Sequence, residues 1–199
     1  MPAARELSLR ARSGLLVGLL AMATASSVQA ETRTYTSTEL NYSVALPTTC
    51  KVEEGPGTLE AICSPDLNAE KSQAAVAASA LLLELDSERV PVDAKAYDEA
   101  DFRQELPEAV CGEADNIKVK IADVVRAADG NRTTWTATVT CPEIKFLGLT
   151  ERAATVRYVI MPGFRHRMMT RVPAADKTAT QTTRDAFFAS FAVPAPKSQ

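Results

Sequence analysis

The sequence predicts an α+β fold, in which an antiparallel β-sheet of about six or seven strands is covered by two main helices. Three observations lead to this prediction. Short segments of alternating apolar and polar residues are joined by turn signals, which is typical of antiparallel hairpins. Two longer segments have the apolar spacing of helices. Four cysteines follow a segment typical of a secretory leader, so we expect two disulfides.

Residues 1–30 have the layout of a secretory signal peptide. Arginines precede an apolar run over residues 14–25, and the small-residue cleavage site Val28-Gln29-Ala30 follows it. The run is shorter than the roughly 20 residues that a membrane-spanning helix needs. We therefore expect cleavage after Ala30 and a periplasmic or secreted protein of bacterial type. We expect no transmembrane segment in the mature chain.

The mature chain is expected to form one α+β domain over residues 31–193, with a flexible C-terminal tail at 194–199. The whole sequence has a net charge of −3. The leader contains three arginines and one glutamate, so its removal leaves a chain that is two charges more acidic. This acidity argues against nucleic acid as a partner.

The first part of the domain is predicted to consist of hairpins. Strands are expected over 34–37 and 42–46, and a further hairpin joins 50–54 to 58–63 through the turn signal Gly55-Pro56-Gly57. Residues 74–85 fit either a helix or a buried strand, and we favour a strand over 79–86.

Pro91 and Asp93 indicate the start of the first helix. We expect it to run over 94–106, with Asp93 as its cap, and to end before Pro107 because proline disfavours a helical residue in front of it.

The clearest strands lie in the second half of the chain. Alternation from Ile117 and again over 134–141 predicts a hairpin that turns at Asp129-Gly130-Asn131. A second hairpin joins 154–160 to 164–172 through Pro162-Gly163. A final helix is expected over 176–191.

The cysteines are expected to pair as Cys50–Cys63 and Cys111–Cys141. In the predicted hairpin around Pro56, Cys50 lies almost opposite Cys63, at a separation that a disulfide can span. Cys141 ends a strand, and Cys111 is expected in the loop that leads to its hairpin partner. A redox or metal role is less well supported, because there is no Cys-x-x-Cys motif and only one histidine.

This layout resembles the PsbP-like fold. The segment from Tyr35 to Pro47 is similar to the opening hairpin of that family. The C-terminal part of the chain is also similar to that of the family. The similar segments are the strand residues Arg157-Tyr-Val-Ile, the strand over 164–171 and the helix that ends at Phe191. The resemblance implies a binding or assembly module rather than an enzyme. The four cysteines are not a feature of the family.

No catalytic residues, metal ligands or cofactors are predicted. The motifs of nucleophilic hydrolases, phosphate-binding loops, zinc proteases and calcium loops are absent from the sequence. The only histidine, His166, shares the inward phase of its strand with Phe164 and Met168. We therefore interpret it as a hydrogen-bonded core residue rather than a catalytic one. The carboxylates between Glu84 and Glu105 are interpreted as a solvated surface.

A basic patch is the candidate binding site. Arg165, Arg167 and Arg171 share the outward phase of one predicted strand, and Arg157 lies on the adjacent strand. Together they could dock an acidic partner or an anionic ligand. The alternative is a solvated face, or one that is neutralised by the acidic segment between Glu84 and Glu105.

The sequence therefore favours a non-enzymatic, exported binding or assembly module that acts through a protein surface. Its partner would be an envelope protein or a small anionic ligand. The alternatives are a small secreted enzyme with an unrecognised site, or a structural envelope protein.

Overall fold

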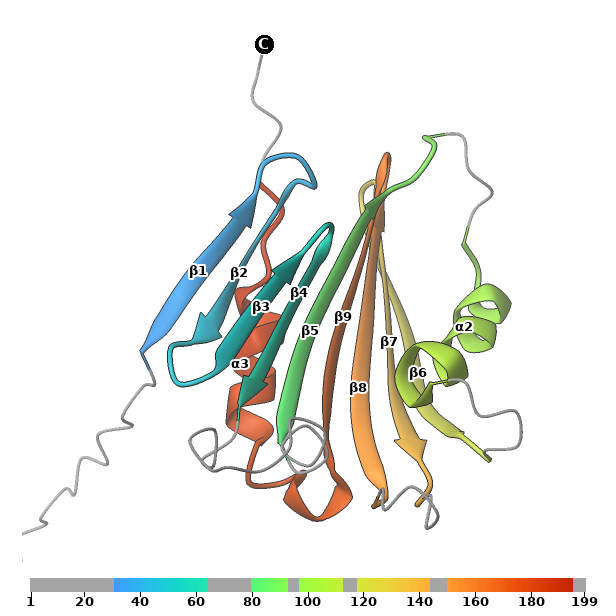
Figure 1. Cartoon of the computed structure of the whole chain (residues 1–199). Helices are drawn as coiled ribbons and strands as arrows, with labels where there is room; N and C mark the ends of the chain where they lie inside the picture. The colour runs from blue at the N-terminus through green and yellow to red at the C-terminus, as the bar shows by residue number, and fades with distance from the viewer. Residues whose placement is uncertain (1–30, 64–79, 93–96, 113–117, 144–149, 195–199) are drawn as a thin grey trace, which may run out of the picture.

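The computed structural model describes residues 31–63, 80–92, 97–112, 118–143 and 150–194. Its centre is a seven-stranded antiparallel sheet with the strand order β3-β4-β5-β9-β8-β7-β6, beside a two-stranded sheet of β1 and β2 (Figure 1). The strands are β1 (Thr32–Ser37), β2 (Tyr42–Pro47), β3 (Lys51–Gly55), β4 (Thr58–Cys63), β5 (Leu81–Arg89), β6 (Lys120–Asp129), β7 (Arg132–Cys141), β8 (Arg152–Met161) and β9 (Phe164–Pro173).

The helices lie on opposite faces of this sheet. Helix α2 (Glu99–Cys111) lies against the β6–β7–β8 end, whereas α3 (Gln181–Ser190) and the β1–β2 hairpin cover the other face towards β3, β4 and β5 (Figure 1). The predicted α+β fold with an antiparallel sheet and two covering helices is therefore confirmed. Among the described residues, each helix covers only part of its face.

Two apolar cores fill the spaces between these layers. On the α2 face, Phe102 and Leu106 of the helix pack with Trp135, Val156 and Tyr158 of the sheet. On the α3 face, a second buried cluster is built from helix, hairpin and sheet residues, among them Val44, Leu83, Met168 and Phe187. Strand β5 is buried on both faces of the sheet, and a strand of this kind has a nearly continuous run of apolar residues. For this reason the sequence of residues 74–85 fitted either a helix or a buried strand. The described part of that region, from Leu81, is a strand.

Helix α2 differs from its prediction at both ends. It begins at Glu99, with Asp98 as its cap: the Asp98 carboxylate accepts hydrogen bonds from the backbone N–H groups of Ala100 and Asp101. The predicted cap, Asp93, lies outside the described residues. The helix continues through Pro107 to Cys111, because Phe102, Leu106 and Val110 hold one side of it in the core on both sides of the proline.

The final helix and the strand after α2 also start later than predicted. The segment expected to open the last helix forms a short 3-10 turn, η2 (Ala174–Asp176), and α3 begins at Gln181. Strand β6 begins at Lys120 rather than near Ile117, which lies outside the described residues. The predicted tail also lies outside them from residue 195.

Both predicted disulfides are present. Cys50 and Cys63 face each other across the β3–β4 hairpin with their Cα atoms 4.3 Å apart. Cys111 and Cys141 are 5.6 Å apart at Cα. Cys111 is the last residue of α2 rather than part of a loop, so this bridge ties the end of the helix to the end of β7.

The outer strands of the large sheet are short or irregular. Strand β3 has five residues, and charged side chains occupy three of them. Strand β6 is interrupted by a register shift between Ala122 and Val125, where Asp123 adopts a left-handed backbone with φ of 54°.

Candidate functional site

The four predicted arginines do not form one patch. In the β8–β9 hairpin, Tyr158 lies opposite Arg167, and Arg157 lies opposite Met168. Directly opposed residues of an antiparallel pair point to the same face. Arg165, Arg167 and Arg171 therefore lie on the α2 face with Tyr158, and Arg157 lies on the α3 face with Met168.

Arg167 is held by carboxylates of the neighbouring strand. Its Nη2 lies 2.8 Å from Glu84 Oε1 and 3.1 Å from Asp86 Oδ2, both on β5. Burial alone would lower the pKa of the guanidinium, but Glu84, Tyr158 and Asp86 outweigh it and raise that pKa. The charge of Arg167 is thus compensated within the sheet.

Arg165 links the sheet to α2. It forms ion pairs with Glu88 of β5 and with Glu105 of α2, the latter at 3.1 Å from its Nη1. Its guanidinium carbon lies 5.5 Å from the ring centroid of Tyr97, whose hydroxyl donates a hydrogen bond of 3.0 Å to Glu105. These contacts fix the position of the helix over the sheet.

The third arginine on this face serves the fold in the same way. Arg171 donates a hydrogen bond of 2.9 Å to the carbonyl oxygen of Val110, in the last turn of α2. The three predicted arginines of the α2 face are therefore engaged with acidic side chains between Glu84 and Glu105 or with the helix end. Among the described residues, these three do not form a free basic patch, and the neutralised face that the sequence had left open as an alternative describes Arg165 and Arg167.

Arg157 has different surroundings on the α3 face. Its Nη1 donates a hydrogen bond of 3.2 Å to the carbonyl oxygen of Phe188, and its guanidinium carbon lies 4.7 Å from the ring centroid of that residue. Burial and the charge of Arg132 lower its pKa, and Asp185 opposes them with a smaller effect. Arg157 is thus a partly buried cation that lacks the carboxylate contacts of Arg165 and Arg167.

His166 is a core residue, as predicted. Its side chain has no solvent exposure, and Nδ1 lies 3.0 Å from the hydroxyl oxygen of Ser87. The rings of Tyr42, Phe164 and Phe191 surround it. Burial, assisted by the charge of Arg132, lowers the pKa of the imidazole to about 4. Both His166 and Ser87 are thus enclosed in the core.

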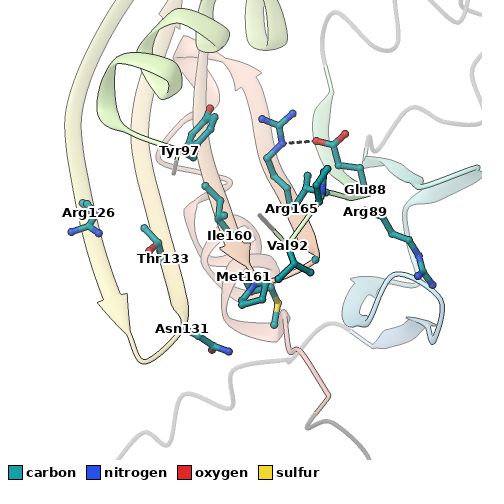
Figure 2. A pocket seen from close by; sticks show the side chains of 14 residues that line it. Glu88, Arg89, Val92, Tyr97, Arg126, Asn131, Thr133, Ile160, Met161 and Arg165 are labelled. Atoms are coloured by element: carbon teal, nitrogen blue, oxygen red, sulfur yellow. Dashed lines mark hydrogen bonds and ion pairs between the residues drawn. The ribbon is translucent and has the colours of Figure 1, made fainter. Parts of the chain in front are cut away.

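A concave site lies at the end of the sheet where β8 turns into β9. This end groove has a volume of about 550 Å³ and is bounded by the residues after β5, Tyr97 in front of α2, the β6–β7 hairpin and the β8–β9 turn (Figure 2). Its apolar lining consists of Val90, Pro91, Val92, Ile160, Met161 and Pro162. Val92 is 78% exposed, which is unusual for a large apolar side chain within a concave surface.

Arginines lie at the margins of the end groove. Arg126 of β6 and Arg89 of β5 stand on opposite sides of it in Figure 2, with Ile160 and Val92 between them. Within the described residues, neither has a carboxylate at ion-pair distance: Arg126 lies over the Trp135 ring at 5.7 Å, and Arg89 donates to a backbone carbonyl. The groove therefore combines an apolar floor with uncompensated positive charge.

Sequence reasoning missed this groove, because it is assembled from four separate segments. The available signal was the apolar pair Val90 and Val92 around Pro91, outside any predicted element.

The architecture can be compared with solved structures. The solution structure of cyanobacterial PsbP (CyanoP) from Synechocystis sp. PCC 6803 superposes with a TM-score of 0.61 at 12% identity, over 87% of this chain and 99% of that one. The chain has a PsbP-like fold. The resemblance expected from the sequence is thus confirmed at the level of the fold.

Two further solved structures match this chain at lower similarity. The Ran-binding protein Mog1p from Saccharomyces cerevisiae matches with a TM-score of 0.50 at 10% identity, over 83% of this chain and 96% of that one. LpqN from Mycobacterium tuberculosis, which is involved in cell envelope biogenesis, matches with a TM-score of 0.51 at 10% identity, over 77% and 83%. No protein-family model and no curated protein sequence matches the chain. None of the helices among the described residues is long and apolar enough to cross a membrane.

Proposed function

We propose that this chain is an exported, non-enzymatic binding module that acts in the periplasm or outside the cell through a protein surface. The observation that carries the proposal is the end groove, with its exposed apolar floor and its uncompensated arginines. Concave apolar surfaces with a few polar groups at the margin are the usual form of a binding site. The partner of best chemical fit is a protein segment in which an apolar side chain is followed by a carboxylate.

The charge of the groove supports an acidic-apolar segment over a basic one. The one carboxylate of its lining, Glu88, is paired with Arg165, whereas Arg89 and Arg126 are not paired with carboxylates among the described residues. An apolar side chain that covers Val92 would remove exposed surface from water, at roughly 25 cal/mol per Å². Neighbouring carboxylates would meet the arginines at the margin.

Binding rather than catalysis is supported by the composition of the groove. Its described lining contains neither a histidine, a serine nor a cysteine. The chain's single histidine is enclosed in the core. Fold neighbours point the same way, since Mog1p is a Ran-binding protein and LpqN takes part in envelope biogenesis.

Export is supported by the leader-like residues 1–30 and by the two disulfides, which persist in oxidising compartments. We propose that residues 31–193 are the mature domain. N-terminal sequencing of protein recovered from the periplasm should begin at Glu31-Thr32-Arg33. Recovery of the protein with residues 1–30 retained would contradict export by cleavage.

The groove can be tested with two matched exposed valines. Val92 lies in the groove, and Val125 on β6 is 59% exposed but outside its lining. A photo-crosslinking residue is placed at either position in cells that export the protein. A defined adduct at position 92 that is lost in Arg126→Glu, and is absent at position 125, supports the proposal. The same adducts at both positions, or none at 92, would refute it.

A further inference from the structure

A second polar site lies on the α3 face, along the line where α3 meets β8. We call it the seam and define it by Arg184 of α3, Arg157 and Thr155 of β8, and Thr136 and Thr138 of β7. Arg184 Nη1 lies 3.5 Å from Thr155 Oγ1, and Arg157 donates to the carbonyl oxygen of Phe188 at 3.2 Å. The helix and the strand thus bring the two arginines to the same seam.

The strand register adds hydroxyl groups to the seam. Thr136 of β7 lies opposite Arg157, and Thr138 lies opposite Thr155. Opposed residues share a face of the sheet, so these threonines lie beside the arginines. All three threonines and Arg157 are partly exposed, so solutes can reach the seam.

The spacing of the two arginines suits one small anion. Arg184 contacts Thr155, and Arg157 contacts Phe188. Arg184 and Phe188 are one helical turn apart along α3, and Thr155 and Arg157 are two residues apart along β8. Each of these separations corresponds to roughly 5–7 Å. Two guanidinium groups at this separation can donate to the same tetrahedral oxyanion from two sides.

The positive charge of the seam is not compensated as it is on the α2 face. Within the described residues, no carboxylate lies at ion-pair distance from Arg157 or Arg184. Arg132, at the start of β7, adds a third positive charge that is close enough to lower the pKa of Arg157. Asp185 lies on the exposed side of α3, and its effect on that pKa is smaller than those of burial and Arg132.

Two charged donors of the seam are buried without a hydrogen-bond partner among the described residues. Arg184 is only 6% exposed; its Nη2 donates to the carbonyl oxygen of Lys177 at 2.7 Å, but its Nε is buried with no hydrogen-bond partner. The Nε of Arg157 is also buried without a partner. Buried donors are normally satisfied, so each unsatisfied one calls for an acceptor.

We propose that the seam binds a phosphate- or sulfate-type oxyanion, either free or carried by a small organic molecule. Arg157 and Arg184 supply charged donors in the fork geometry that suits such oxygens, and the hydroxyls of Thr136 and Thr155 supply neutral ones. The seam is separate from the end groove, so this proposal does not depend on the proposed function.

The test is a titration of the disulfide-bonded mature protein, followed by backbone amide NMR. Inorganic phosphate, sulfate and glycerol phosphate are the probes, and sodium chloride keeps the ionic strength constant. We expect saturable shifts at residues of β7, β8 and α3. Tighter binding of glycerol phosphate than of inorganic phosphate would indicate an organic carrier, and equal or weaker binding would indicate the free ion.

Variants decide whether the seam is the binding site. Arg157→Gln should weaken phosphate binding at least tenfold. Arg103→Gln removes the same charge from an exposed arginine of α2, which lies outside both the seam and the end groove, and should leave binding unchanged. If Arg184→Gln fails to fold, Arg184→Lys keeps the charge but loses the fork and should still weaken binding. The proposal would be overturned if the shifts seen with phosphate matched those seen with chloride alone, or if Arg157→Gln and Arg103→Gln weakened binding equally.

Discussion

Acidification should destabilise this protein through His166. The imidazole is enclosed by aromatic rings and has a pKa of about 4 in the folded state, below the ordinary value of 6.5. Above about pH 6.5 the side chain is neutral in both states. Between pH 6.5 and 4 the unfolded chain binds a proton that the folded chain does not, so the free energy of unfolding falls as the pH falls.

The size of this effect follows from the two pKa values. Each pKa unit corresponds to about 1.4 kcal/mol, so the full loss approaches roughly 3 kcal/mol once the pH reaches 4. Below that pH both states bind the proton, and this contribution stops changing. His166 is the only histidine of the chain, so no other side chain has its ordinary pKa near 6.5.

Urea unfolding with the disulfides intact, at several pH values between 7.5 and 4, measures the effect. Carboxylates also titrate towards the acid end, so the informative quantity is the difference between wild type and His166→Leu. The free energy of unfolding of that variant should fall less between pH 6.5 and 4 than that of wild type. Parallel curves for the two proteins would refute the reasoning, as would an imidazole that titrates near 6.5 by NMR in the folded protein.

Three further changes test the fold. Replacing both Cys50 and Cys63 with serine should cost about 3 kcal/mol of unfolding free energy, because a short loop is released in the unfolded chain; a change below 1 kcal/mol by urea titration would contradict this. Gly57→Ala should lower the free energy of unfolding by more than about 1 kcal/mol, since the φ of Gly57 is 79° and a Cβ there would lie 2.6 Å from a carbonyl oxygen. Gly130→Ala is the control, because the φ of Gly130 is 58° but a Cβ there would meet no atom within 4 Å. It should lower the free energy of unfolding by less in the same assay. Pro107→Ala should raise the melting temperature, because it restores an N–H donor inside α2. A lower melting temperature for this variant, measured by calorimetry, would contradict that account.

Local patterns were sufficient to predict most strands and both disulfides. Strand β4 spans Thr58–Cys63, as the turn signal in front of it predicts. The β3–β4 pairing places Lys51 opposite Ile62, so Cys50 and Cys63 meet at the next position. Alternation and turn residues are local information, and the sequence carries it directly.

The alternation of residues along one strand could not show on which face of the sheet each arginine lies. Both sides of the sheet are buried in part, so an apolar residue on one strand does not show which face is inward. The same mirror argument that paired the cysteines would have helped: around the Pro162-Gly163 turn it places Arg167 opposite Tyr158, and Arg157 opposite Met168. The seam and the end groove depend on α3 and the segment after β5, whose positions are set by tertiary packing.

The predicted boundaries of α2 were wrong for a related reason. Asp93 and Pro107 are strong local signals for a start and a stop, yet α2 begins after Asp98 and passes through the proline. The buried side chains Phe102, Leu106 and Val110, together with the Cys111 bridge, outweigh one missing hydrogen bond. Tertiary contacts of this kind leave no mark in a short window of sequence.

The irregular edge of β6 has a consequence for how copies of this protein meet. A regular outer strand offers a row of free N–H and C=O groups on which a second sheet can grow. The register shift at Ala122 and Val125, and the left-handed turn at Asp123, break that row and bend it away from a straight line. The bulge therefore disfavours edge-to-edge growth of a second sheet along the whole length of β6. The longest uninterrupted stretch of this outer edge runs from Val125 to Asp129.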